Sequence, residues 1–168
     1  MTAMNWTSLQ AILALLLFGA GMVNDLRSKK VRNQIVIVGF IVGITYVIAV
    51  QGFSGLMMSA LSFLTAAVAI LPLYLMRVLG GGDVKLLLAA SVLMDWKSVL
   101  ITIFASMIWG SLLGIFQVIL KGQGKAFAHN MLALAHRAKL KETSVHKMPF
   151  TVALLFGYLS SLVWMGGI

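Results

Sequence analysis

The chain has 168 residues, of which 61% are hydrophobic and only 10% are charged. Soluble domains typically carry about 45–50% apolar and about 25% charged residues, so this composition excludes an ordinary soluble domain, a disordered chain and a coiled coil. The net charge of +9 is explained by membrane orientation, and no nucleic-acid partner is expected. The absence of cysteine excludes disulfides, a thiolate zinc site and a cysteine nucleophile.

Six apolar stretches predict membrane-spanning helices, and five of them have about the ~20 residues that a helix needs to cross a bilayer. In chain order they are Trp6–Val23, Gln34–Val50, Leu56–Met76, Val84–Met94, Val99–Leu120 and Pro149–Ile168. The fourth is short and can cross only if its helix extends from about Gly80 to Trp96. That extension would draw Asp83 and Lys85 to the membrane surface. The segment Gln51–Gly55 predicts a tight turn on the outer side.

The basic residues predict the orientation of the chain. Alternation of six spans places twelve of the thirteen Lys and Arg residues on one side and only Lys97 on the other. The basic loops should therefore face the cytoplasm and both termini should lie outside. We expect residues 1–168 to form a single domain in the lipid bilayer of the inner membrane, an all-α bundle of six transmembrane helices. The stretch Lys121–Lys147 is expected to form a basic interfacial helix on anionic headgroups.

Only four acidic residues are present, so each can be considered separately. Glu142 lies in the long basic loop, where charge balance explains it. Asp95 lies at the outer boundary beside Trp96 and Lys97, which is a usual place for a charged anchor. These two residues are expected to have structural roles.

Asp25 and Asp83 differ because the topology places both at cytoplasmic helix ends, at similar depth. A charged residue at the centre of a membrane helix costs roughly 2.5–3.5 kcal/mol, so carboxylates near hydrocarbon are candidates for function. Each of them alone could instead be a solvated charge balanced by Arg27 or Lys85. Two carboxyl groups within hydrogen-bond reach can share one proton, which favours hydrolysis of a peptide bond by an activated water.

Three consecutive glycines, Gly80, Gly81 and Gly82, precede Asp83. Glycines are poor helix formers that allow another backbone to approach closely, so a peptide could pair with this segment as an added strand. A flexible hinge between two spans is the alternative. The three histidines are interpreted as surface residues, and no metal or cofactor is expected. They are His129, His136 and His146.

The segment GGGDVKLL resembles the GxGD motif of membrane-embedded aspartyl proteases, above all that of the type IV prepilin peptidases. A second motif of that family, an Asp followed by basic residues and Ile-Pro-Asn, is similar to Asp25–Asn33, with Arg32 at the usual Pro position. KMPFTVALLFGYL is similar to the family's last helix. The resemblance implies a catalytic pair and residues that shape the site. The pair is Asp25 and Asp83, and the shaping residues are Gly80, Gly81, Gly82, Lys85 and Asn33.

The resemblance implies an aspartic endopeptidase that removes the short basic leader of prepilins or prepilin-like proteins at the cytoplasmic face. The chain is similar to the short peptidase-only forms of tight-adherence pilus systems and archaea, so no methyltransferase activity is expected. Two alternatives are a small proton- or ion-coupled transporter that uses the same Asp pair, and a non-enzymatic membrane subunit. Hydrolysis is favoured because both Asp residues lie at one face, whereas a relay would place acids across the bilayer.

Overall fold

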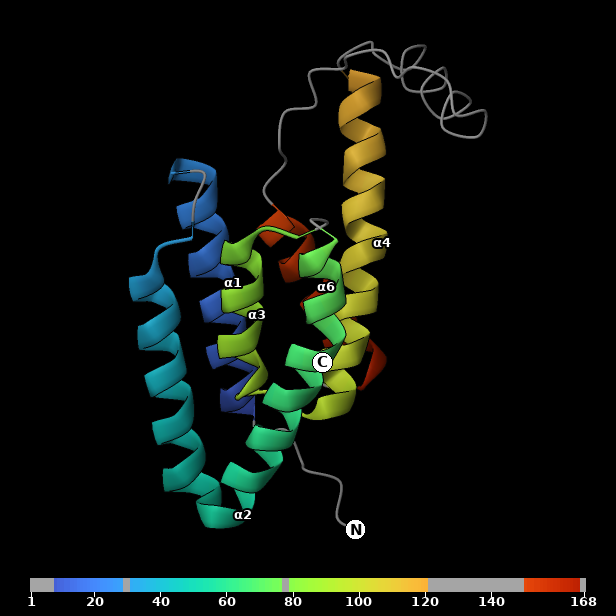
Figure 1. Cartoon of the computed structure of the whole chain (residues 1–168). Coiled ribbons are helices and arrows are strands. Elements are labelled where there is room, and N and C mark those ends of the chain that lie inside the picture. The colour runs from blue at the N-terminus through green and yellow to red at the C-terminus, as the bar shows by residue number, and fades with distance from the viewer. Residues whose placement is uncertain (1–7, 29–30, 77–78, 121–149, 167–168) are drawn as a thin grey trace.

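The computed structural model describes residues 8–28, 31–76, 79–120 and 150–166. Of these residues 91% are helical and none is in a strand, which confirms the all-α class within the described ranges. The helices are α1 (Ser8–Ser28), α2 (Asn33–Leu75), α3 (Gly81–Ser91), α4 (Trp96–Leu120) and α6 (Phe150–Trp164) (Figure 1).

The long helix α2 reverses its direction at Gly52, so its two halves run in opposite directions along the bundle (Figure 1). Gly52 has φ 64° and ψ −152°, a left-handed backbone conformation that favours glycine. The Ser54 hydroxyl donates a hydrogen bond of 3.1 Å to the carbonyl of Gln51 at this bend. The turn predicted for Gln51–Gly55 is therefore present, and α2 contains two of the predicted apolar stretches.

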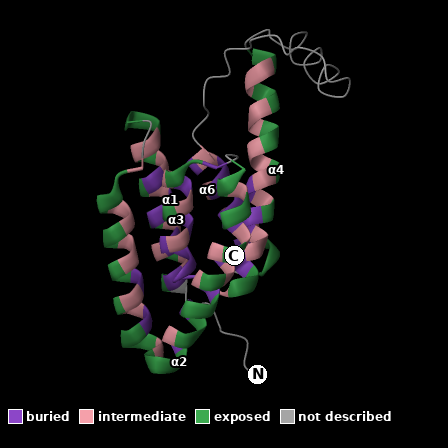
Figure 2. Cartoon of the chain, viewed as in Figure 1, coloured by how far each residue is buried: buried purple, intermediate pink, exposed green. Residues whose placement is uncertain are grey.

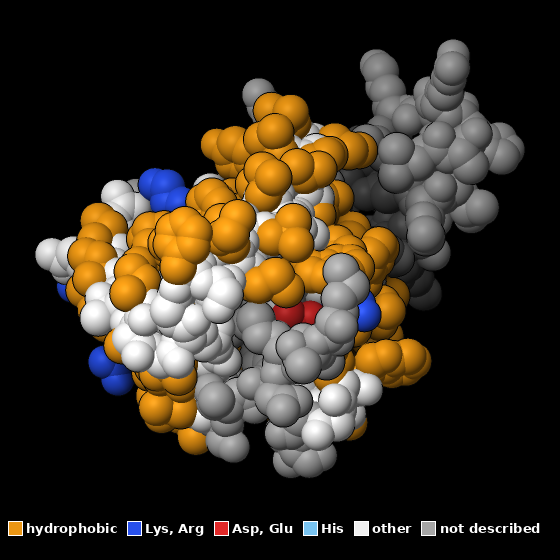
Figure 3. All heavy atoms as spheres, turned by 90° about the horizontal axis from the view of Figure 1, so that it is seen from below, with side chains coloured by type: hydrophobic (Ala, Val, Ile, Leu, Met, Phe, Trp, Pro, Cys, Tyr) orange, Lys and Arg blue, Asp and Glu red, His pale blue; other side chains and the backbone are white. Residues whose placement is uncertain are grey.

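Three of the described helices, α1, α2 and α4, are long and apolar enough to cross a membrane. Large hydrophobic side chains point outward along them, including Phe53 at 77% exposure and Leu75 at 71%. Figure 3 views the bundle from the end at which α2 reverses and shows hydrophobic side chains over much of that face. Such a surface is suited to lipid rather than to water.

The fourth stretch does not form the helix from about Gly80 to Trp96 that it would need to cross a bilayer as one helix, because α3 ends at Ser91. Asp95 begins the next helix instead: its Oδ2 accepts hydrogen bonds from the backbone N–H groups of Lys97 (3.2 Å) and Ser98 (3.4 Å). The 11 residues of α3 cover ~16 Å, about half of a bilayer core.

Helix α3 compensates for its short length by lying inside the bundle, in contact with α1, α2 and α6. Most of its side chains and those of the following turn are buried (Figure 2). Leu86, Leu87, Ala90 and Met94 are fully buried. A non-helical turn at membrane depth is tolerated where protein rather than lipid surrounds it.

Helices α4 and α6 pack closely because small side chains line their contact. A Cβ atom on Gly157 of α6 would lie 2.7 Å from the carbonyl oxygen of Thr102, so only glycine fits there. The Thr102 hydroxyl donates a hydrogen bond of 3.1 Å to Ser161 across the same contact. Small residues recur at every fourth position of α4, a pattern typical of helix pairs in membranes. They are Ser98, Thr102, Ser106 and Gly110.

The end of α1 and the first turns of α2, α3 and α6 lie together at one end of the bundle (Figure 1). This arrangement brings four segments that are far apart in the sequence to one place. The expected interfacial helix at Lys121–Lys147, Glu142 and the three histidines lie outside the described residues.

Candidate active site

The two acidic side chains singled out in the sequence lie at this end of the bundle, within range of direct electrostatic interaction with each other. Asp25 is half-buried in the last two turns of α1. Asp83 is 8% exposed and lies in the first turn of α3. Both acids therefore lie on neighbouring helices at the same end of the bundle, and their role as a catalytic pair stays a prediction.

A close contact between α1 and α3 supports this pair from within the bundle. Gly21 lies one turn before Asp25, and Leu86 lies three residues after Asp83, so each shares a helix face with its Asp. A Cβ atom on Gly21 would overlap the side chain of Leu86, which is fully buried. The two helices are thus in direct contact within about one turn of each carboxyl group.

Asp83 is the third residue of α3, and Gly80 is the N-cap residue of the same helix. Glycine has no side chain to cap the first backbone N–H groups of a helix, and no side-chain cap hydrogen bond is made at Gly80. The Asp83 carboxyl group therefore lies beside the backbone donors at the start of its own helix.

Each glycine that precedes Asp83 has a different neighbour. A Cβ atom on Gly80 would lie 3.0 Å from Oδ2 of Asp83, so a side chain there would crowd the carboxyl group. A Cβ atom on Gly82 would lie 3.1 Å from Cβ of Val31, in the connection between α1 and α2. A Cβ atom on Gly81 would lie 3.8 Å from Cε2 of the Tyr74 ring, which is ordinary contact. The glycine run keeps side chains away from the Asp83 carboxyl group and lets α3 begin against Val31.

Two of the residues expected to shape the site contact each other. Nζ of Lys85 donates a hydrogen bond of 3.2 Å to Oδ1 of Asn33, and both side chains are exposed. Asn33 is the first residue of α2, and Lys85 follows Asp83 by two positions. This contact links the start of α2 to α3 at the edge of the site.

Thr151 is a site residue that the sequence did not predict. Its hydroxyl donates a hydrogen bond of 2.9 Å to Oδ2 of Asp25, which is 126 residues away in the chain. It lies in KMPFTVALLFGYL, so the resemblance to a last helix marked the segment but not the hydroxyl.

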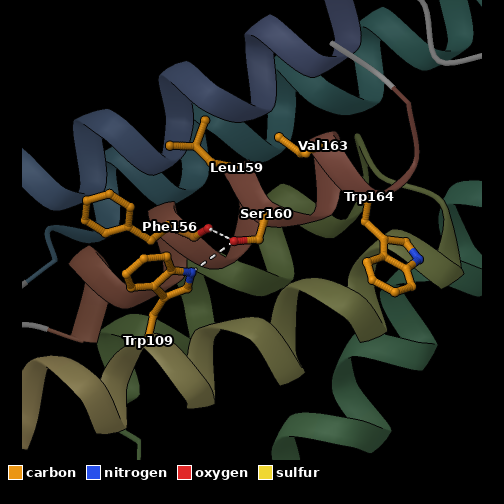
Figure 4. A pocket seen from close by; sticks show the side chains of 6 residues that line it. All are labelled: Trp109, Phe156, Leu159, Ser160, Val163 and Trp164. Atoms are coloured by element: carbon orange, nitrogen blue, oxygen red, sulfur yellow. Dashed lines mark hydrogen bonds between the residues drawn. The ribbon is translucent and has the colours of Figure 1, made fainter.

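A hollow lies between α4 and α6, and neither Asp25 nor Asp83 lines it (Figure 4). Its polar contact is the hydrogen bond of 2.9 Å that Nε1 of Trp109 donates to the Ser160 hydroxyl. Six residues line it, none of them acidic or histidine: Trp109, Phe156, Leu159, Ser160, Val163 and Trp164.

Across the described ranges, no three His, Cys, Asp or Glu side chains are grouped as metal ligands would be.

Comparison with protein families identifies the family of this chain's matched region. The model of the type IV leader peptidase family matches residues 11–115, which are more than half of the chain and include both Asp25 and Asp83. No curated protein and no solved structure matches the chain. Thr151 lies beyond the matched residues.

Proposed function

The chain belongs to the type IV leader peptidase family, whose members are proteases, and we propose that it is an intramembrane aspartic endopeptidase. Its catalytic pair is Asp25 and Asp83. The observation that carries this proposal is their placement at one end of the bundle, on adjacent helices and within electrostatic range. Two such carboxyl groups suit acid–base catalysis by a single unit.

The reaction needs one carboxyl group ionised and the other protonated. The ionised group takes a proton from a water molecule, whose oxygen attacks the carbon of the scissile carbonyl, while the protonated group donates its proton to the carbonyl oxygen. As the tetrahedral intermediate collapses and the C–N bond breaks, the carboxyl group that took the proton from water gives it to the departing nitrogen, and the other carboxylate takes a hydroxyl proton from the intermediate. One water is consumed for each peptide bond, and the pair returns to its starting protonation.

The substrate in this proposal is a prepilin or prepilin-like protein with a short basic leader. The glycine run supports access of an extended peptide, because Gly80 places no side chain against Oδ2 of Asp83. The pair formed by Lys85 and Asn33 lies at the edge of the same site and would shape the substrate groove.

The membrane topology in this proposal has six passes, with both termini outside and the Asp pair at the cytoplasmic face of the inner membrane. The positive-inside distribution supports it, and so does the reversal of α2 at Gly52. The hypothesis of a proton- or ion-coupled transporter has less support. Such a transporter would need an acid toward the other end of the bundle, and Asp95, which lies at that end, caps α4. Its carboxylate is thus used in the start of a helix rather than in a path across the bilayer.

Cleavage of a prepilin by the purified chain in lipid nanodiscs tests this function. We expect one cut between the basic leader and the apolar helix, identified by mass spectrometry of both products. Asp95→Asn is the matched control, because Asn also caps helices well and the variant should cleave normally. No cleavage of any prepilin by folded protein would contradict the substrate class, and cleavage by Asp25→Asn would contradict the catalytic pair.

A further inference from the structure

Thr151 stands out among the hydroxyl residues of the described helices. Several of the others donate to a carbonyl four positions earlier in their own helix, as membrane helices allow. Ser62, Thr65, Ser106, Ser111 and Ser160 do so. The Thr151 hydroxyl instead donates to Oδ2 of Asp25 on a different helix.

The position of Thr151 in α6 explains this difference. It is the second residue of the helix, so the residue four positions earlier precedes the helix. Its side chain is fully buried, so water does not compete for the hydroxyl. Hydrogen bonds to charged acceptors are stronger than neutral ones, and a buried threonine can therefore hold a carboxylate in one orientation.

Other contacts hold α6 against α1 independently of Thr151. The Tyr158 hydroxyl donates a hydrogen bond of 3.1 Å to the carbonyl of Ala11, and the Tyr158 ring packs on Phe18 with 5.2 Å between ring centroids. The helix pair should therefore survive loss of the Thr151 hydroxyl. A loss of activity in a variant without the Thr151 hydroxyl can therefore be assigned to the site rather than to unfolding.

We propose that Thr151 is a positioning residue for the catalytic pair, an inference that rests on the proposed function. By occupying Oδ2 of Asp25, its hydroxyl fixes the rotation of that carboxyl group. Oδ1 is then the oxygen available to exchange a proton with water or with Asp83. Such fixing of a reacting group raises the rate of the chemical step more than it raises substrate affinity.

The test compares kcat and KM for prepilin cleavage in nanodiscs among single variants of two buried threonines. Thr151→Val removes the hydroxyl at nearly constant shape, and Thr151→Ser keeps a hydroxyl. Thr102→Val is the matched control, since Thr102 is equally buried and its hydroxyl bonds Ser161 away from the acids. We expect kcat of Thr151→Val to fall by about tenfold or more with KM within about twofold, while Thr151→Ser and Thr102→Val keep most of kcat.

Three results would overturn this inference. They are a kcat for Thr151→Val within about twofold of the unmodified chain, an equal loss in Thr151→Ser, and an equal loss in Thr102→Val. If Thr151→Val does not fold, Thr151→Ala and Thr151→Ser decide: an active Ser variant beside an inactive Ala variant supports the role, and equal activities overturn it. Asp25→Asn separates the two proposals, because its activity would refute the catalytic pair whatever Thr151 does.

Discussion

Gly21 of α1 lies directly against Leu86 of α3, and a single added methyl group at Gly21 would overlap the Leu86 side chain. The contact is one helical turn from Asp25 and close to Asp83 along α3. The separation of the two carboxyl groups therefore depends on a glycine that has no chemical role.

Gly21→Val should push α1 away from α3 and separate the pair. We expect cleavage to fall by about 10–100-fold, since a shift of about 1 Å can cost this much, and folding stability to fall by about 1–3 kcal/mol from overpacking. Gly19→Val is the matched control, because a Cβ atom on Gly19 of the same helix meets no atom within 4 Å. Cleavage rates and thermal unfolding in detergent check both, and equal behaviour of the two variants would show that the contact is unimportant.

Gly82→Val should impair cleavage because its side chain would meet Val31, which already lies 3.1 Å from the position of a Cβ atom. The first turn of α3 would have to move, and Asp83 would move with it. Val31→Ala should restore part of the activity of Gly82→Val, and Gly114→Val in α4, which meets open space, should be harmless. Unchanged turnover by Gly82→Val would show that the segment is only a linker.

Asn33→Ala tests the contact with Lys85 at the edge of the site. Since both residues are exposed, the loss in folding stability should be below about 1 kcal/mol. We expect KM for the prepilin to rise by a few-fold with kcat nearly unchanged, whereas Gln34→Ala beside it should match the unmodified chain. A fall in kcat at constant KM would place Asn33 in the chemistry instead.

The pair predicts a bell-shaped dependence of kcat/KM on pH. Cleavage should stop at low pH when both carboxyl groups are protonated and at high pH when both are ionised, and the two limbs belong to the pair rather than to either residue. Rates between about pH 4 and about pH 10, on protein shown by circular dichroism to stay folded, measure the profile. A rate that rises without a high-pH limb would count against a shared proton.

Much of the fold follows from the sequence because lipid imposes simple constraints. The apolar stretches and the Gln51–Gly55 turn correspond to the helices and to the reversal at Gly52. The end of α3 at Ser91 does not follow from hydropathy because the apolar stretch continues to Met94, although Asp95 before Trp96 carries the signal of an N-cap. Hydropathy measures burial in lipid and in protein alike, so it does not locate the end of a helix inside the bundle.

The site is less completely predictable from the sequence. Asp25 and Asp83 could be identified because acids are rare in this chain and the charge distribution places both at one face. Gly21 could not be identified from the sequence, because glycine is common in membrane helices and the contact with Leu86 is known only from the packing of α1 against α3. Thr151 likewise depends on how α6 meets α1, a long-range contact that composition and spacing do not encode.

The most direct test of the catalytic pair is the rate of prepilin cleavage by Asp25→Asn, Asp83→Asn and the double variant, each reconstituted at equal amounts in nanodiscs. If the two residues act as one unit, each single variant should lose about 10³-fold or more, and the double variant should be no worse than either. Asp95→Asn should cleave at nearly the full rate. Substantial cleavage by a folded variant that lacks either Asp25 or Asp83, or losses that multiply in the double variant, would contradict the account.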